Sequence, residues 1–284
     1  AVAISAFMSK HGKLRLLGSA EEVPEYQRRP HIWRYYRLER PCVRHFCSCH
    51  NELGNIWTHV LAYAYTLYRF AAWLSAQDMI MSMEWPRPLY ALGVVVYFVA
   101  ALAVFSASVQ FHWRMCSPIR EFLCWRCLDQ SCCLALVVVG FFAGIPMGFH
   151  CRPWLQVAYL AQSLLVLIAM SVIVWITPKE NAGFLASSII ASALTALVPA
   201  VHWLLISAEG RRVGGQSLMG AMVFGLTAAT VFTSCVPERL APGRFDLLGS
   251  SHQIWHVLIF LSIAAYGDSL TAVFALTGSK EYCA

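Results

Sequence analysis

Five side chains in this sequence have types and spacings that suit metal chemistry. His252 and His256 lie four residues apart, so on a helix both imidazoles project from one face toward a common point. Ser108 precedes His112 by the same interval in another apolar segment, and Asp129 stands in a third. Three imidazoles suit Zn²⁺ and leave a fourth position open for water, whose pKa the ion lowers from near 15.7 to about 7. Because a nearby carboxylate can orient that water or carry its proton, the pattern predicts a catalytic zinc site.

Each of these residues also has a purely structural interpretation. An aspartate inside a membrane costs about 2.5–3.5 kcal/mol, so Asp129 needs a partner, and Arg126 would supply one in a local ion pair without function. Ser108 would donate a hydrogen bond to a carbonyl of its own helix. The three histidines would be interfacial residues that reach lipid headgroups. The metal site requires instead that all of them meet at one depth, which depends on the topology of the chain.

The composition of the chain is that of a membrane protein. Of the 284 residues, 58% are hydrophobic and only 13% are charged, and the mean hydropathy is +0.58. These values exclude a disordered chain, a coiled coil and an ordinary water-soluble enzyme, because too few polar residues remain to cover a soluble surface. The formal charge of +6 does not indicate nucleic-acid binding, since the basic residues lie in the N-terminal segment and in short loops.

The apolar residues fall into long runs that predict an all-α fold, a bundle of seven transmembrane helices. Prolines and glycines separate the runs. We expect a cytoplasmic basic N-terminal segment over residues 1–53, a seven-transmembrane-helix domain over 54–276 and a short extracytoplasmic tail over 277–284. Within the domain the expected helices cover residues 55–76, 89–112, 122–145, 154–176, 184–207, 216–236 and 252–275.

The distribution of Lys and Arg predicts the orientation of the bundle. Nine of these residues precede the first helix, and a cytoplasmic N-terminus places fourteen of them inside and five outside. The positive-inside rule therefore predicts a cytoplasmic N-terminus and an extracytoplasmic C-terminus, the opposite of a G-protein-coupled receptor. In this topology His112 ends the second helix and His252 begins the seventh, so both lie near the cytoplasmic face. Asp129 lies about two turns into the third helix from the same face.

Several sequence blocks resemble the progestin and adipoQ receptor family, which includes the adiponectin receptors. These blocks, in chain order, are YYR at 35–37, HNELGNIWTH at 50–59, SVQFH at 108–112, LDQ at 128–130 and PERLAPGRFDLLGSSHQIWH at 237–256. The resemblance implies a seven-helix fold with a cytoplasmic N-terminus. It also implies a zinc ion held by His112, His252 and His256, with Asp129 and Ser108 beside the water. The wider superfamily includes alkaline ceramidases, which hydrolyse the amide bond of ceramide.

Two functions of different classes are compatible with these features. The first is an intramembrane zinc amidase, with ceramide or a related sphingolipid reaching the site from the bilayer and Asp129 relaying a proton to the leaving amine. The alternative is a seven-helix receptor or adaptor for a hormone or lipid, in which zinc is structural. The sequence predicts a multi-pass protein of the plasma membrane or of Golgi or other endomembranes.

Two further groups of residues near the first helix remain open. Cys42, Cys47 and Cys49 are interpreted as a second metal site, as sites of S-acylation or as free thiols. His59, in the block NIWTH, is expected near the zinc site as a hydrogen-bond donor and not as a ligand.

Overall fold

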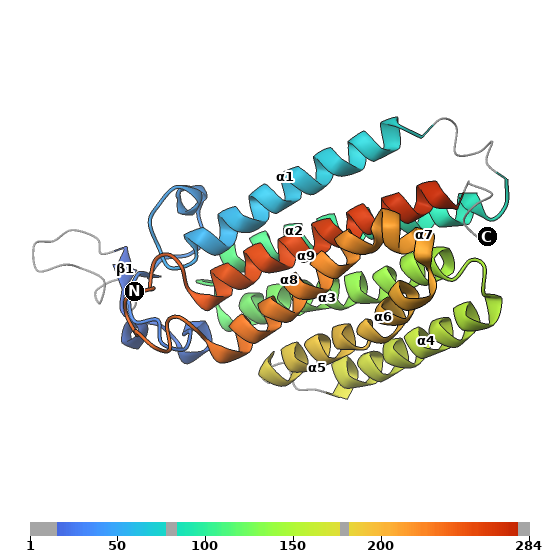
Figure 1. The fold of residues 1–284 in the computed structure, drawn as a ribbon. Coiled ribbons are helices and arrows are strands. Elements are labelled where there is room, and N and C mark those ends of the chain that lie inside the picture. Colours follow the sequence, from blue (N-terminus) through green and yellow to red (C-terminus); the bar gives the residue numbers. More distant parts are fainter. Residues whose placement is uncertain (1–15, 78–83, 177–181, 278–284) are drawn as a thin grey trace, which may run out of the picture.

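The structure, a computed structural model, describes residues 16–77, 84–176 and 182–277. Long helices that run roughly along one axis dominate it (Figure 1). They are α1 (Leu53–Ser75), α2 (Arg87–Trp113), α3 (Ile119–Gly148), α4 (Pro153–Ile176), α5 (Ala182–Leu194), α6 (Leu197–Ile206), α8 (Gln216–Ser234) and α9 (Ser251–Leu276). Short elements complete the described chain: β1 (Leu17–Gly18), β2 (Tyr36–Arg37), the 3₁₀ turns η2 (Ala20–Glu22), η3 (Glu25–Gln27) and η4 (Val43–Phe46), α7 (Ala208–Gly210) and the π-helical turn η6 (Arg211–Gly215).

The predicted all-α fold is confirmed, and each expected helical segment has its counterpart within a few residues. Among the described residues, six helical stretches are long and apolar enough to cross a membrane. α1 is not one of them, although its 23 residues span about 35 Å at 1.5 Å per residue. Its lower hydropathy has a local cause, because Asn55, His59 and Thr66 are polar and buried against the bundle. The orientation of the bundle and the three domain boundaries stay predictions.

The segment expected as one helix over residues 184–207 is broken into α5 and α6. The break precedes Pro199, which has no N–H to donate to the carbonyl of Thr195 four residues earlier. Gln162 of α4 replaces that donor, since its Nε2 lies 3.1 Å from the Thr195 carbonyl oxygen. A proline inside the predicted run therefore ended a helix where hydrophobicity alone indicated continuity.

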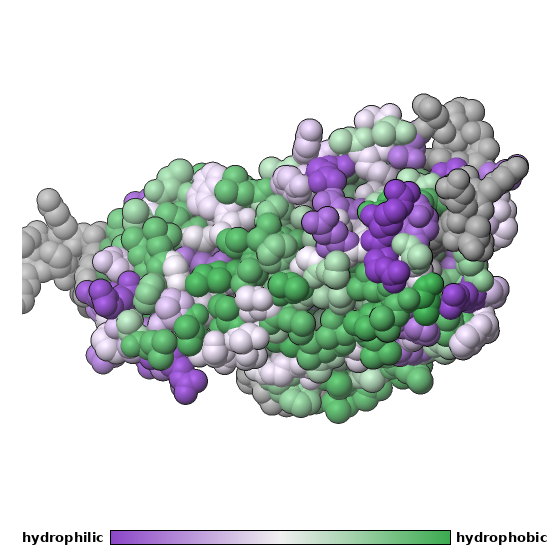
Figure 2. Space-filling model, viewed as in Figure 1, coloured by the Kyte–Doolittle hydropathy of each residue, from purple (hydrophilic) through white to green (hydrophobic). Residues whose placement is uncertain are grey.

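α2 lies at the centre of the bundle, where it packs against α1, α3 and α9. Its buried residues, among them Ala91, Val94, Ala101 and Phe105, form the middle of the main apolar core. The outer surface is also apolar. Figure 2 shows hydrophobic side chains over the middle of one face, with hydrophilic ones gathered toward the two ends of the bundle. This distribution is the one expected of a surface that faces lipid between two aqueous boundaries.

Arg69 of α1, whose charge is costly inside a membrane helix, pairs with Asp268 of α9. Its Nη1 also donates a hydrogen bond to the Tyr65 hydroxyl at 2.9 Å. The pair ties α1 to α9 near the ends of these helices that lie away from the histidines.

The N-terminal segment covers the end of the bundle where α1, α3 and α9 begin (Figure 1). β1 and β2 form a two-stranded antiparallel pair, and the segment then contacts the turn between α2 and α3. Tyr26 donates a hydrogen bond to the Ser117 carbonyl at 3.0 Å, and the Trp113 indole donates one to the Cys42 carbonyl at 3.0 Å. The segment is therefore part of the folded domain at the same end as His112.

Candidate metal centre

The structure brings His112, His252 and His256 together. His112 lies in the last turn of α2, whereas His252 and His256 occupy successive turns at the start of α9. One nitrogen from each ring forms a set whose members all lie within 4.8 Å of one another. The ring centroids are 5.2 Å apart for His112 and His252, 4.8 Å for His112 and His256, and 4.7 Å for His252 and His256. The three side chains can hold a metal ion.

Hydrogen bonds to two of these rings decide which nitrogen is available. His112 Nδ1 lies 2.8 Å from Glu52 Oε2, and His256 Nδ1 lies 3.2 Å from the Asn55 carbonyl oxygen. A backbone carbonyl and an ionised carboxylate can accept hydrogen bonds but cannot donate them. Each Nδ1 is therefore the atom that carries the proton. The Nε2 lone pairs of neutral His112 and His256 are then left for a metal. A ring whose other nitrogen donates to a carboxylate or carbonyl is the usual arrangement of histidines that ligate zinc, and these residues fit that ion.

Glu52, which the sequence interpretation did not assign, is the carboxylate that supports His112. It is 2% exposed at the N-terminal boundary of α1. Arg29 Nε lies 2.5 Å from its Oε1, and Asn55 Nδ2 lies 2.6 Å from its Oε2. Burial raises the pKa of Glu52, but the charge of Arg29 and the hydrogen bond to His112 outweigh it and hold that pKa well below its usual range. Glu52 therefore stays ionised, and it lies inside the HNELGNIWTH block.

A second arginine of the N-terminal segment holds the end of α2 that carries His112. Arg37 is 5% exposed, and its Nη2 and Nη1 donate to the carbonyl oxygens of His112 at 2.7 Å and of Trp113 at 2.8 Å. A cation at a helix C-terminus satisfies carbonyls that have no partner within the helix and interacts favourably with the helix dipole. The N-terminal segment thus fixes His112 twice, through Glu52 and through the backbone.

Asp129 and Ser108 lie on α3 and α2, and Asp129 is not one of the grouped ligands. Asp129 Oδ1 is sealed from solvent and has no hydrogen-bond partner among the residues that the structure describes. Ser108 is buried on α2 and lies next to this carboxylate. The Arg126 guanidinium lies 5.4 Å from the centroid of the Phe122 ring, and the interpretation of Asp129 as its ion-pair partner stays a prediction.

The cysteines before α1 form a different kind of cluster. Oxygen, sulfur and nitrogen atoms of Glu39, Cys42 and His45 lie within 4.8 Å of one another. His45 Nε2 lies 3.0 Å from Glu39 Oε1, while its Nδ1 accepts a hydrogen bond from the Cys42 backbone N–H at 3.3 Å. Arg44 pairs with the same carboxylate and lowers the pKa of Glu39. These contacts use the atoms that a metal would need, and Cys47 and Cys49 are free and exposed.

The remaining histidines divide between the two ends of the bundle. His59 of α1 stacks on His256, which confirms the expected proximity. Its expected role as a hydrogen-bond donor is wrong, because neither ring nitrogen has a partner among the described residues. His150 Nδ1 is hydrogen-bonded to the Tyr90 hydroxyl at 2.8 Å, and His202 Nδ1 is hydrogen-bonded to the Tyr159 hydroxyl at 2.6 Å. Neither belongs to the grouped ligands.

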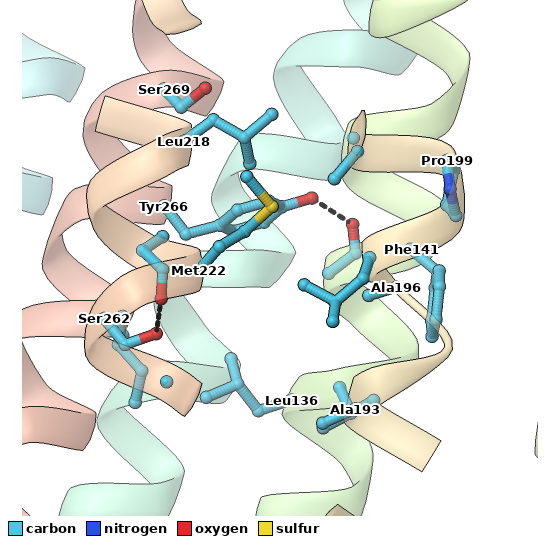
Figure 3. Close-up of a pocket in the computed structure, with 18 of the residues that line it drawn as sticks. Leu136, Phe141, Ala193, Ala196, Pro199, Leu218, Met222, Ser262, Tyr266 and Ser269 are labelled. Carbon is cyan, nitrogen blue, oxygen red and sulfur yellow. Dashed lines mark hydrogen bonds between the residues drawn. The ribbon is translucent and has the colours of Figure 1, made fainter. Parts of the chain in front are cut away.

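An apolar cavity of about 340 Å³ lies between α3, α5, α6, α8 and α9 (Figure 3). Side chains such as Leu136, Phe141 and Leu218 line it. The hydroxyls of Tyr266 and Ser262 in its wall donate to the carbonyls of Gly140 and Ala221, both at 2.8 Å. The lining also includes Trp255, which precedes His256, and Cys133, one turn beyond Asp129. The cavity therefore extends toward the histidine end of the bundle.

Substitution of Glu52 by glutamine is expected to weaken metal binding about 10- to 100-fold, because loss of a partner that orients a ligating histidine typically has this cost. The amide keeps the size of the side chain but can turn an NH₂ group toward His112 Nδ1. Competition with a chromophoric zinc chelator would measure the dissociation constant. Glu209→Gln is the matched control, since Glu209 pairs with Arg212 at the other end of the bundle. Equal affinities for Glu52→Gln and wild type would contradict the role of Glu52.

Comparison with known proteins gives a consistent family relationship. The model of the family described as "Haemolysin-III related" matches residues 47–266. The "Adiponectin receptor protein" of Drosophila melanogaster is 27% identical over 250 residues, an alignment that covers 85% of this chain and 55% of that protein. The "Heptahelical transmembrane protein ADIPOR1" of Oryza sativa subsp. japonica is 28% identical over 316 residues, which cover 90% of this chain and 84% of that protein.

A third relative is the "Progestin and adipoQ receptor family member 3" of Mus musculus, which is 26% identical over 262 residues, covering 87% of this chain and 81% of that protein. The chain thus spans little more than half the length of the Drosophila relative but most of the other two.

Proposed function

The chain belongs to the haemolysin-III-related family of multi-pass membrane proteins, which includes the adiponectin receptors and the progestin and adipoQ receptors, and from this premise we propose that it is a zinc-dependent intramembrane lipid-amide hydrolase. The substrate class is ceramide or a related sphingolipid. One observation carries the proposal: three histidines with nitrogens directed to one point lie in the same buried end of the bundle as a carboxylate oxygen without a partner. This combination suits hydrolysis better than a purely structural metal, which needs no such carboxylate.

Bound by His112, His252 and His256, zinc would supply Lewis-acid activation of a water molecule and of the amide carbonyl. Glu52 holds the His112 ring in the tautomer that exposes Nε2. Asp129 accepts a proton from the attacking water at Oδ1 and delivers it to the leaving amine. Ser108 orients the Asp129 carboxylate. The amide is thereby cleaved to a fatty acid and a sphingoid amine.

The apolar cavity supports a lipid substrate. Its wall offers hydrocarbon side chains, and the hydroxyls of Tyr266 and Ser262 are already hydrogen-bonded to backbone carbonyls (Figure 3). Such a wall suits an acyl chain rather than a polar molecule. Because Trp255 and Cys133 line it close to His256 and Asp129, a chain in the cavity would place its carbonyl end near the histidines.

We also propose that the histidine end of the bundle faces the cytoplasm, as the charge distribution predicts. The state of the cysteines supports this orientation. Cys151, in the turn between α3 and α4 at the opposite end, is disulfide-bonded. The cysteines at the histidine end, namely Cys42, Cys47, Cys49, Cys116, Cys124, Cys127 and Cys235, are free. Disulfides form in oxidising compartments, whereas cytoplasmic thiols stay reduced.

Within the family, we propose that the chain is most similar to the fourth member of the progestin and adipoQ receptors, a resemblance carried by the blocks HNELGNIWTH, CRPWL at 151–155 and PGRFD at 242–246. The printed names of the relatives favour one second function, a receptor or adaptor in which a hormone or lipid is the ligand and the metal is structural. That alternative requires movement of the helices rather than turnover.

The test of the proposed function is hydrolysis of ceramide by the purified protein in lipid nanodiscs, with the metal content measured on the same samples. We expect fatty acid to be released by the metal-bound protein and release to stop after the metal is removed by a chelator. Restoration by added Zn²⁺ would identify the active metal. A zinc-loaded protein that releases no fatty acid from several lipid amides would contradict the hydrolase and favour the receptor.

A further inference from the structure

His59 is a buried histidine that the proposed reaction does not use. It lies on α1 with 4% of its surface exposed. One face of its ring stacks on the ring of His256, with centroids 3.8 Å apart and planes 14° from parallel. The ring of Phe105 of α2 packs against it with centroids 5.2 Å apart and planes at 66°. The imidazole of His59 therefore lies between a proposed metal ligand and the central helix of the bundle.

The stacked geometry excludes His59 as a fourth ligand of the same ion. An imidazole nitrogen binds a metal along its lone pair, which lies in the plane of the ring. An ion in the plane of His256 would lie well outside the nearly parallel plane of His59. The lone pairs of the two rings therefore cannot converge on one atom. In agreement, His59 is not part of the group formed by the other three histidines.

The nitrogens of His59 do not hold the ring in place. Neither Nδ1 nor Nε2 has a hydrogen-bond partner among the residues within the described ranges. The ring is held by its stack on His256 and by an edge-type contact with Phe105. A histidine whose nitrogens have no partner acts on a stacked neighbour as a flat aromatic surface.

α1 contacts His256 at two further positions next to His59. The carbonyl of Asn55 lies 3.2 Å from His256 Nδ1, and the hydroxyl of Thr58 lies 3.1 Å from the same nitrogen. These contacts fix the tautomer of His256, but a hydrogen bond at one nitrogen still permits the ring to tilt. The stack with His59 removes that freedom, because any rotation of the His256 ring about its Cβ–Cγ bond would bring the two rings into collision on one side.

The register of α1 against α9 is itself tightly defined at this point. A Cβ on Gly54 would lie 2.6 Å from Gln253 Cδ, so a larger residue here would displace this side chain. Gln253 is held in turn, since its Oε1 accepts from the Gly249 N–H at 2.8 Å and its Nε2 donates to the Leu247 carbonyl at 3.0 Å. The close contact between α1 and α9 therefore places His59 against the face of the His256 ring.

We propose that His59 is a positioning residue of the metal site, which acts by stacking on His256 and so fixing the plane in which the His256 Nε2 lone pair points. The inference rests on the proposed metal site and adds a residue that sets its geometry. The aromatic face is the feature required, because the electron-rich face of one ring favours a neighbouring ring that a metal has made more positive.

Three substitutions of His59 distinguish a stacking role from coordination of the metal and from simple filling of space. His59→Phe keeps the aromatic face and removes both nitrogens, His59→Leu fills the space without an aromatic face, and His59→Ala removes both. We expect His59→Phe to bind Zn²⁺ with an affinity close to wild type. His59→Leu and His59→Ala should bind about 10- to 100-fold more weakly, as expected when a group that orients a ligand is lost. The metal affinity is measured by chelator competition, and the visible spectrum of the Co²⁺-substituted protein reports the ligand geometry.

The controls distinguish a positioning role from loss of packing. His59→Ala should have a lower melting temperature than wild type, and His59→Leu should restore it. His59→Leu should not restore the wild-type Co²⁺ spectrum, whereas a role in packing alone predicts that it would. His202→Ala removes a histidine that is hydrogen-bonded to Tyr159 at the other end of the bundle, and it should leave affinity and spectrum unchanged.

Three results would overturn the inference. Wild-type affinity and spectrum in His59→Ala would show that the stack has no effect on the site. Loss of binding in His59→Phe comparable to that of His256→Ala would show that His59 coordinates the metal. Equal behaviour of His59→Leu and His59→Phe would reduce its role to packing. If wild-type protein bound no metal at all, the proposed function would fail first, so the two failures are distinguishable.

Discussion

Replacement of His252 and His256 by alanine is expected to abolish metal binding and to reduce ceramide hydrolysis to the uncatalysed background. Only one nitrogen of the described group, that of His112, would remain to hold the ion. Without the metal, water keeps a pKa near 15.7 instead of about 7, so almost no nucleophile forms at neutral pH. The same loss is expected of His112→Ala, in which Glu52 would lose one of its buried hydrogen-bond partners while keeping Arg29. Metal content and fatty-acid release are measured together in nanodiscs.

A matched control is available at the other end of the bundle. His150→Ala removes a histidine that is hydrogen-bonded to Tyr90 at 2.8 Å, outside the metal group, and should keep both metal and activity. Folding of each variant is checked by size-exclusion chromatography and by its melting temperature. We expect the double variant to melt at the temperature of the metal-free wild type, because a ligand that binds only the folded state stabilises it. Full activity in the double variant or in His112→Ala would refute the ligand assignment.

Asp129→Asn is expected to retain the metal and to lower the rate of hydrolysis about 10²- to 10⁴-fold, the usual contribution of a positioned acid or base. Asparagine has nearly the same shape as aspartate but cannot accept the proton from the attacking water. Because Asp129 is not within the group of three ligands, the zinc affinity should change little. The turnover number and the zinc content of the purified variant are the two measurements.

Glu121→Gln is the control for this substitution, since it replaces a half-exposed carboxylate in the first turn of the same helix. A wild-type turnover number for Asp129→Asn would remove Asp129 from the reaction. If Asp129→Asn also left the cellular effect of the protein intact, the structural metal of the receptor alternative would be favoured. A variant that keeps its metal but loses turnover would separate binding from chemistry and support the hydrolase.

The helices were predictable because hydrophobicity along the chain is a local property. Each expected segment corresponds to observed helices, and the deviations have local causes as well. Pro199 divides the fifth segment because it removes one backbone donor, and Gln162 of α4 supplies the replacement. The need of Arg69 for a partner follows from its position in a membrane helix, but the identity of that partner, Asp268, depends on how α1 packs on α9.

The candidate site was predictable where helical spacing and membrane depth sufficed. The interval between His252 and His256 and the position of His112 near the same face indicated that these three residues meet, as they do. The role of Asp129 and Ser108 beside them stays a prediction. The sequence interpretation left open whether Asp129 pairs with Arg126, because spacing alone does not decide where either side chain points. It missed Glu52 because 60 residues separate this carboxylate from His112, and no local pattern joins them.

The sequence by itself determines that the helices lie in a bilayer and how deep each candidate site residue lies in it. Long apolar runs require helices in a bilayer, and the position of each polar residue within its run sets its distance from the membrane surface. What only the tertiary structure decides is the direction of each side chain. Glu52 and Arg29 select the tautomer of His112, and His59 faces the ring of His256, because helices distant in sequence pack with a particular rotation. Depth is a property of one helix, whereas orientation toward a common point depends on the contacts between several.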